Sequence, residues 1–187
     1  MPVAAETLVS LHSVTLPPGA LACPAVASDP PGDLLLSPID GDARSLNQWL
    51  TTFHLACVVI DPYTNESAWI LDTAGRVMDD FRESAVRVAW MVCGTAEDAT
   101  AFLGPLADRF LTFADPDRGF VKAVGLNHLP AFVFVQIDGT VQAVAEGWHP
   151  AEWRKVSDTI ATTTAWSRSV IPEPQDPPPF DGSPAGG

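Results

Sequence analysis

The apolar run Leu-Ala-Cys-Val-Val-Ile at residues 55–60 constrains the fold of this 187-residue chain more than any other feature. Polar and apolar residues do not alternate in it, so it predicts a strand that is buried on both faces. Such a strand lies inside a sheet that is covered by helices on both sides. The run therefore predicts a layered α/β domain.

The residues that follow predict a strand–helix–strand unit. Residues 66–82 place apolar side chains on one face at helical spacing, and the sequence Val-Arg-Val-Ala-Trp-Met-Val-Cys at 86–93 predicts the next strand. Because a crossover helix joins parallel strands, we expect strands 55–60 and 86–93 to run parallel. A further helix begins at Thr95, where Asp98 three residues later resembles a capping box.

Three further segments complete the predicted domain. Residues 33–46 predict a short strand, an Asp-Gly turn and a return to a helical segment over 45–53. Strands 131–136 and 140–145 flank a second Asp-Gly turn and form an antiparallel hairpin. Pro150 stands at the first position of the last helix, where its missing N–H costs nothing.

The two ends of the chain differ in composition from the middle. Residues 1–28 are rich in Ala and Pro and predict a loose extension, whereas residues 29–166 predict the folded domain. From Val170 onward the chain holds six prolines and no basic residue. This composition predicts a disordered, Pro-rich tail over residues 167–187.

The formal net charge of −13, from 10 Lys+Arg against 23 Asp+Glu, argues against two classes of partner. It repels the phosphates of nucleic acids and the anionic surface of membranes, and no apolar run reaches the ~20 residues of a spanning helix. The N-terminus lacks a basic segment, and three cysteines are too few for a disulfide framework. We therefore expect a cytoplasmic protein, and the sequence predicts no oligomeric state.

Two stretches and the last helix resemble a known family. The stretches are "LLLSPIDGDARSL" at 34–46 and "FADPDRGFVKAVGLNHLPAFVFVQIDGTVQAVAEGW" at 113–148. Over roughly residues 30–165 the chain resembles thioredoxin-like proteins of the TlpA and AhpC/TSA branch, which includes thiol-disulfide reductases and peroxiredoxins. The resemblance implies a three-layer α/β/α fold with a mixed central sheet, a βαβ unit followed by ββα. It also implies a cis-proline at Pro130, which turns the backbone of Leu129 toward an extended peptide.

The corner after strand 55–60 departs from both catalytic motifs of this family. Where the reductases carry C-x-x-C, this chain has Thr-Asn-Glu-Ser at residues 64–67. In the peroxiredoxin motif P-x-x-x-T-x-x-C counted from Pro62, the Thr position holds Glu66 and the Cys position holds Trp69. A hydroxyl cannot replace the thiolate that exchanges disulfides, so both chemistries lose their nucleophile.

Two interpretations of residues 64–67 are open. We favour helix capping, in which their side-chain oxygens accept from free N–H groups at the helix start; contact with an anion or another ligand is the alternative. The fold would bring the residues before the cis-proline to the same corner, including a histidine that lacks the motif of a catalytic base. The predicted binding residues are Tyr63, Thr64, Asn65, Glu66, Ser67, His128, Leu129 and Pro130.

The three cysteines are the candidates for thiol chemistry. Cys57 lies within the apolar strand, so we expect a small buried hydrophobic residue. Cys93 ends its strand at the edge where α/β sheets present their sites; we favour structural burial, and a reactive thiol is the alternative. Cys23 lies in a Pro-flanked loop, where exposure is expected. No spacing of His, Cys or acidic residues predicts a metal site, and no motif predicts a cofactor.

These features lead to one leading hypothesis and two alternatives. We expect a redox-inactive thioredoxin-like protein that binds a partner protein or extended peptide beside the cis-proline loop, as a chaperone, scaffold or assembly factor. The first alternative is an enzyme, a thiol-disulfide oxidoreductase or peroxidase that acts through Cys93 alone. In the second, the domain docks into a larger assembly through a helix face or the Pro-rich tail.

Overall fold

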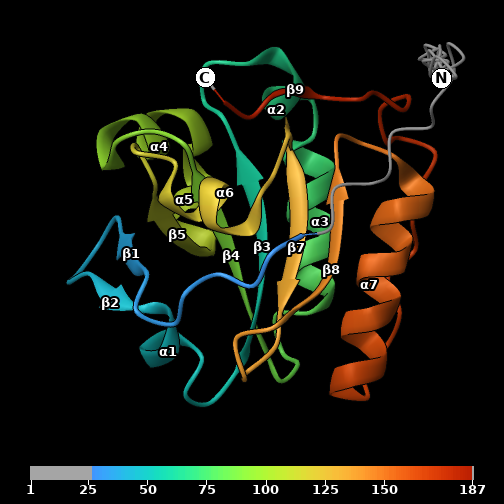
Figure 1. Cartoon of the computed structure of the whole chain (residues 1–187). Coiled ribbons are helices and arrows are strands. Elements are labelled where there is room, and N and C mark those ends of the chain that lie inside the picture. The colour runs from blue at the N-terminus through green and yellow to red at the C-terminus, as the bar shows by residue number, and fades with distance from the viewer. Residues whose placement is uncertain (1–26, 187) are drawn as a thin grey trace, which may run out of the picture.

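The computed structural model describes residues 27–186, so Cys23 and nearly all of the predicted extension lie outside the described residues. The described chain forms three layers, with helices on both faces of a seven-stranded mixed sheet (Figure 1). The strand order is β2-β1-β5-β4-β3-β7-β8. The strands of this sheet are β1 (Leu35–Pro38), β2 (Arg44–Ser45), β3 (His54–Ile60), β4 (Val86–Val92), β5 (Leu111–Ala114), β7 (Ala131–Val135) and β8 (Val141–Glu146).

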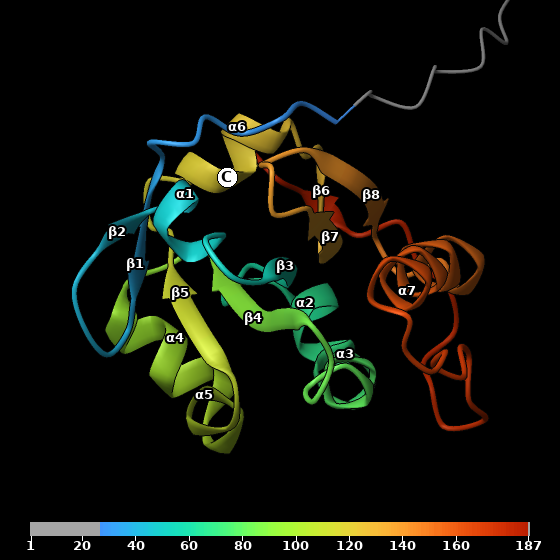
Figure 2. The same ribbon diagram turned by 90° about the horizontal axis from the view of Figure 1, so that it is seen from below.

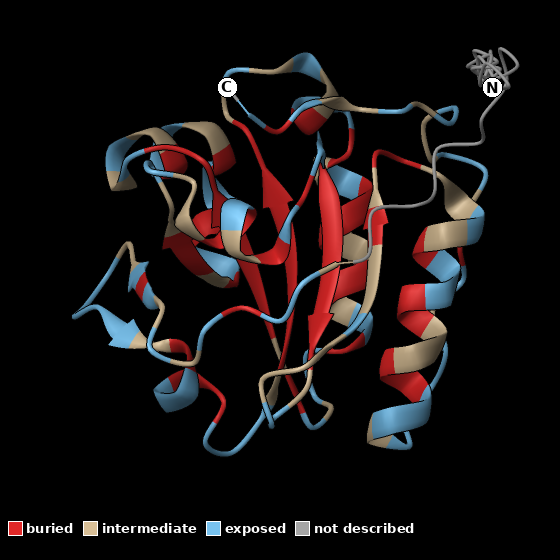
Figure 3. Cartoon of the chain, viewed as in Figure 1, coloured by how far each residue is buried: buried red, intermediate tan, exposed pale blue. Residues whose placement is uncertain are grey.

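Strand β3 lies inside the sheet and is buried on both faces, as its sequence predicts. It pairs in parallel with β4 and antiparallel with β7, which confirms the predicted βαβ unit. Because successive side chains point to opposite faces, Val58 enters one core cluster, whereas Cys57 and Val59 enter the other. Figure 3 shows that most residues of these central strands are buried.

Helices cover both faces of the sheet. They are α1 (Leu46–Trp49), α2 (Asn65–Trp69), α3 (Leu71–Asp80), α4 (Ala96–Leu103), α5 (Pro105–Arg109), α6 (Gly119–Val124) and α7 (Pro150–Thr164). Figure 2 shows α1 and α6 on one face and α3, α4 and α5 on the other; α7 contributes to the same core cluster as α3. Within residues 27–186, none of the helices has the length and apolar character needed to span a bilayer.

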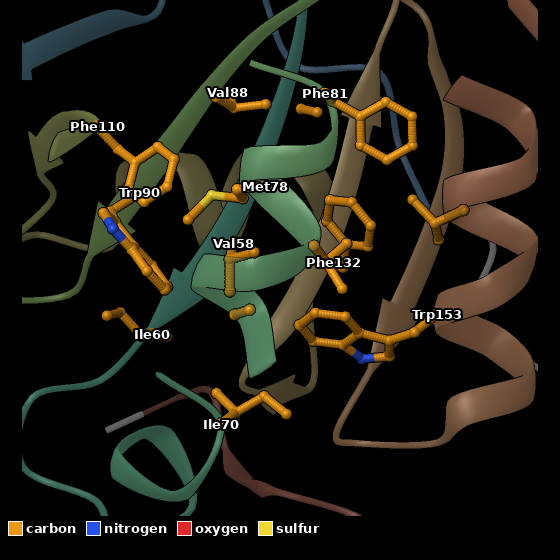
Figure 4. Close-up of a cluster of buried hydrophobic side chains, with 14 of the residues drawn as sticks. Val58, Ile60, Ile70, Met78, Phe81, Val88, Trp90, Phe110, Phe132 and Trp153 are labelled. Carbon is orange, nitrogen blue, oxygen red and sulfur yellow. The ribbon is translucent and has the colours of Figure 1, made fainter. Parts of the chain in front are cut away.

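Aromatic side chains fill the larger core cluster (Figure 4). Trp90 meets Phe110 edge to face, with ring centroids 6.3 Å apart, and Phe132 lies 5.0 Å from Trp153 of α7. Met78 of α3 lies between these two pairs. Rings of this size bury large apolar areas, so the α3–α7 face depends on them for its stability.

One predicted helix is broken in the structure, and another ends at a glycine. The helix expected over 66–82 consists of α2 and α3, because the N–H of Ile70 bonds to the carbonyl two residues before it and interrupts the helical pattern. The helix that begins after Thr95 stops at Gly104, whose φ is +52°. Pro105 follows and opens α5 without an N–H to donate.

Other local signals predict the structure correctly. The Thr95 hydroxyl accepts from the Asp98 N–H at 3.2 Å and the Asp98 carboxylate accepts from the Thr95 N–H at 3.0 Å, which completes a capping box. Strands β7 and β8 form the predicted hairpin around Gly139, whose φ is +89°. Pro150 is the first residue of α7. The helix expected over 45–53 is shorter than predicted, since only the single turn of α1 forms.

The Pro-rich tail is ordered up to residue 186, which contradicts the prediction of disorder over 167–187. From the end of α7 it returns along α3 and crosses the end of the sheet near α2 (Figure 1). There β9 (Ser183–Pro184) pairs with β6 (His128–Leu129) as a separate two-stranded sheet. Ile171 is 3% exposed within the core, and its carbonyl accepts from Arg154 Nε of α7 at 2.7 Å.

The carboxylate of Asp176, which is 1% exposed, holds the middle of the tail. Arg76 Nη2 of α3 donates to its two oxygens at 3.1 and 2.9 Å. The Thr73 hydroxyl donates at 2.9 Å and the Glu173 N–H at 2.7 Å. Composition did not predict this order, because much of it arises from charge-assisted hydrogen bonds to single residues rather than from apolar area.

Replacement of Trp153 tests the importance of the α7 contact. Trp153 is fully buried between Phe132 and Trp148, and its indole N–H donates to Gly147 O at 2.8 Å. We expect Trp153→Ala to lower the free energy of unfolding by about 3–5 kcal/mol, measured by urea denaturation. The matched control Trp166→Ala removes an indole that is 41% exposed and donates one hydrogen bond, and we expect a loss of about 1 kcal/mol. Equal losses for the two variants would contradict this assignment.

Candidate functional site

The predicted corner at the end of β3 is built from three segments. These are the turn and helix start over 61–67, the loop over 125–130 that contains β6, and residues 182–185 of the tail. The peptide bond between Leu129 and Pro130 is cis, the isomer that the resemblance implies. The tail, which the sequence did not assign to the site, connects the two predicted parts.

The hydroxyl groups of the corner bond to β3 rather than cap α2. Ser67 is fully buried, and its Oγ accepts the N–H of Asp61 at 2.9 Å. The Thr64 hydroxyl lies 2.9 Å from Ser67 Oγ and 3.1 Å from the Asp61 carbonyl. Thr64 is the N-cap residue of α2, yet its side chain forms no capping hydrogen bond. The capping interpretation is therefore wrong, because both hydroxyls tie the end of β3 to the helix start.

The remaining predicted residues of this turn have different environments. The Tyr63 side chain is largely exposed, and its hydroxyl donates to Asp98 of the α4 capping box at 2.8 Å. Asn65 is exposed at the start of α2. Glu66, in contrast, faces the tail, and its Oε2 accepts the hydroxyl of Ser183 at 2.7 Å. This hydrogen bond lowers the pKa of Glu66.

An ion pair that sequence reasoning missed lies beneath the corner. Arg118 Nη2 donates to Asp61 Oδ2 at 2.6 Å, with side chains that are 14% and 7% exposed. Arg118 Nη1 donates to the Ala185 carbonyl of the tail at 2.9 Å. One sequence feature could have indicated this residue. Arg118 is one of only 10 Lys and Arg residues, and it follows Asp-Pro-Asp in the stretch that carries the family resemblance. Arg118 therefore connects the end of β3 to the backbone of the tail.

Strand β9 occupies the edge of the cis-proline loop. Leu129 lies opposite Ser183 and His128 opposite Pro184 in an antiparallel register. The Ala185 N–H donates to the Asn127 carbonyl at 2.7 Å, just beyond the two-residue ladder. An extended segment thus already pairs with the backbone that the sequence predicts as the binding edge.

Glu146 at the end of β8 fixes the loop that carries β6. Its Oε2 accepts the N–H of His128 at 2.8 Å and the N–H of Asn127 at 3.2 Å. The same oxygen lies 3.4 Å from His128 Nδ1, so the histidine side chain is directed toward Glu146. His128 lies opposite Pro184 of β9, but both its N–H and its imidazole face Glu146.

A second contact holds the tail just before it reaches the edge. The backbones of Trp148 and Phe180 exchange two hydrogen bonds, of 2.8 and 3.0 Å. The Trp148 indole donates to the Pro177 carbonyl at 2.7 Å, and the ring of Phe180 meets Trp69 edge to face at 5.6 Å. Trp69 and Phe180 line an open apolar hollow of about 590 Å³ together with the three prolines at residues 177–179. They set the position from which the last residues enter the site.

The two described cysteines are poorly suited to thiol chemistry in this state. Cys57 is fully buried in β3, and burial raises its pKa far above the ordinary value. Cys93, 3% exposed after β4, has its pKa raised to about 12 by burial, which outweighs the opposing effect of Arg118. Residues 27–186 hold no group of three His, Cys, Asp or Glu side chains that could bind a metal ion.

Alkylation of the folded chain tests the state of Cys93. Because its pKa is raised, the thiolate fraction of Cys93 at pH 8 is about a thousandfold lower than that of an exposed cysteine. Only the thiolate reacts with an alkylating reagent. We expect iodoacetamide to leave Cys57 and Cys93 unmodified while the fold is intact, as read by peptide mass mapping. The control is the same reaction in guanidinium, where both must label. Rapid labelling of Cys93 in the folded protein would contradict its burial.

Comparisons with known proteins identify the fold. No protein-family model and no curated protein matches the chain. A putative thiol:disulfide interchange protein DsbE from Chlorobium tepidum is 15% identical, over 74% of this chain and 97% of that one, with a TM-score of 0.61. Peroxiredoxin Q of Xanthomonas campestris is 12% identical, over 74% and 96%, with a TM-score of 0.58.

A third solved structure agrees with these two. MTB DsbF, solved in mixed oxidised and reduced forms, is 18% identical over 70% of this chain and 98% of that one, with a TM-score of 0.56. Identities this low show the fold and leave the activity to be argued from the site. The chain therefore has the thioredoxin-like fold that these thiol-disulfide oxidoreductases and peroxiredoxins share.

Proposed function

We propose that this protein is a redox-inactive thioredoxin-like domain that holds an extended polypeptide segment at β6. The observation that carries the proposal is the antiparallel pairing of β9 with β6, since an edge that pairs with one extended segment can pair with another. Strand addition uses backbone groups that every polypeptide has, so it suits a chaperone, scaffold or assembly factor. The partner is accordingly another protein or an extended peptide.

Oxygen chemistry at the corner supports a redox-inactive role. Thr64 and Ser67 lie near the position where the reductases carry sulfur, and their hydroxyls are engaged with Asp61. A serine or threonine hydroxyl does not exchange with a disulfide, because it ionises too weakly. The buried free thiols fit a reducing compartment, and we include a cytoplasmic location in the proposal.

The alternative, an oxidoreductase or peroxidase that acts through Cys93, requires that thiol to meet a substrate. Cys93 is almost completely buried, and its raised pKa leaves little thiolate at neutral pH. Both properties oppose nucleophilic attack. Burial therefore favours the binding function over the catalytic one.

A turnover assay separates the two functions. We expect the full chain to reduce insulin with dithiothreitol no faster than dithiothreitol alone, and to consume no hydrogen peroxide, because residues 27–186 present no thiolate at the corner. Cys93→Ser and Cys93→Ala variants should behave as the unmodified chain does. Turnover by the unmodified chain that is lost in both variants would establish the catalytic alternative instead.

A binding assay tests the edge itself in the full chain. A Cβ atom at residue 182 would lie 2.6 Å from the Leu129 carbonyl oxygen, at a φ of +86° that strains an L-residue. Gly182→Ala should therefore displace the tail and raise the affinity for an unfolded probe, reduced carboxymethylated lactalbumin, by at least about tenfold. Gly139→Ala is the matched control, since its φ is also positive and nothing lies within 4 Å. If neither this probe nor a short extended peptide binds any of these proteins, the proposed function is wrong.

A further inference from the structure

The tail and the domain approach each other so closely that both need glycine at the point of contact. A Cβ atom on Gly147 of the domain would lie 2.6 Å from the carbonyl of Asp181, and one on Gly182 would lie 2.6 Å from the Leu129 oxygen and 3.3 Å from Gly147 Cα. Real Cβ atoms do not tolerate such distances to backbone. The surface at β6 is therefore shaped for a segment that carries no side chain at this position.

The next position of the segment requires a hydrogen-bond donor. The Ser183 hydroxyl donates to Glu66 Oε2 at 2.7 Å, a distance typical of a charge-assisted bond. Glu66 belongs to the turn in which thioredoxin-like reductases carry their catalytic motif. Its carboxylate therefore contacts the bound segment at that corner. A residue without a donor would leave the carboxylate facing an apolar group.

The third position imposes little selection. Pro184 is exposed and lies opposite His128. Because Ala185 donates its N–H to Asn127, and hydrogen-bonded pairs alternate along an antiparallel ladder, Pro184 falls at a non-hydrogen-bonded position. A proline lacks only an N–H that the ladder does not use there. Many residues fit this position.

The fourth position accepts only a small side chain. Ala185 is 1% exposed and belongs to the core cluster that contains Leu129. Its N–H donates to Asn127 and its carbonyl accepts from Arg118, so the backbone on both sides of the side chain is fixed. A larger side chain would have to displace packed core residues.

We propose that residues 182–185 are an internal ligand, and that β6 selects partner segments of the same pattern: glycine, a hydroxyl residue, any residue, and a small apolar residue. The proposal rests on the proposed function and adds to it the sequence that the edge recognises. The docked tail and a partner segment exclude each other, because both need the same backbone groups of β6. The tail therefore regulates access to the site.

Titration of the opened full-length variant tests this selection. The probe is the capped peptide Asp-Gly-Ser-Pro-Ala-Gly, added to isotope-labelled Gly182→Ala protein, with the amide shifts of Asn127 and Leu129 as the readout. We expect saturable shifts at these amides. A peptide with Ala in place of Ser should bind about fivefold or more weakly. A peptide with Leu in place of its alanine should produce no saturable shift, whereas Ala in place of Pro should change affinity less than about twofold.

The role of Glu66 is tested by a double-mutant cycle. In a Gly182→Ala/Glu66→Ala protein, the Ser and Ala peptides should bind equally, because the group that distinguishes them is gone. A discrimination that survives in this protein would overturn the assignment of Glu66. Ala185→Leu opens the same edge by a different route and replaces Gly182→Ala if circular dichroism shows that the latter does not fold.

Two measurements separate failure of this inference from failure of the proposed function. Binding of unfolded lactalbumin at the same amides without binding of the Gly-Ser-Pro-Ala peptide would overturn the recognition pattern and leave the proposed function standing. Unchanged hydrogen exchange at the amides of residues 183 and 185 in both opened variants would overturn the internal-ligand assignment, since the tail would not depend on the contacts described. If neither lactalbumin nor the peptide binds, both the recognition pattern and the proposed function are refuted.

Discussion

The backbone of β6 sets the constraint on which the arrangement of the C-terminal segment depends. Strand β6 lies outside the seven-stranded sheet, although Leu129 is fully buried, so its polar groups need partners from elsewhere. Glu146 satisfies the N–H groups of Asn127 and His128, and β9 supplies the paired strand. Any polypeptide that replaces the tail has to satisfy the same groups in the same extended conformation.

A chain of hydrogen bonds joins the corner at the end of β3 to the tail. Ser67 fixes the N–H of Asp61, the carboxylate of Asp61 binds Arg118, and Arg118 reaches the backbone of the tail. Hydrogen bonds alone thus connect the start of α2 to the bound segment. Such contacts form and break without a change of oxidation state, so under the proposed function the occupancy of the edge depends on affinity rather than on redox potential.

The sequence predicts the layers of this fold because periodicity and turn chemistry determine them locally. The buried strand β3, the β7–β8 hairpin and the start of α7 at Pro150 all follow from short stretches. The docked tail does not, because single residues far apart in the sequence hold it, such as Asp176 against Arg76. The family resemblance pointed to the corner at the end of β3, but the partners of its hydroxyls and the contacts of Arg118 depend on three-dimensional proximity that no local pattern encodes.

The tail is held at several points before it reaches β6, among them Asp176 and the Trp148–Phe180 bridge. Its last residues are therefore tethered a short distance from their binding edge, and short tethers correspond to effective concentrations of about the millimolar range. A dilute free segment with equal contacts cannot compete at such concentrations. Under the proposed function, a partner segment displaces the tail only when the partner also engages the domain elsewhere, because both segments are then tethered.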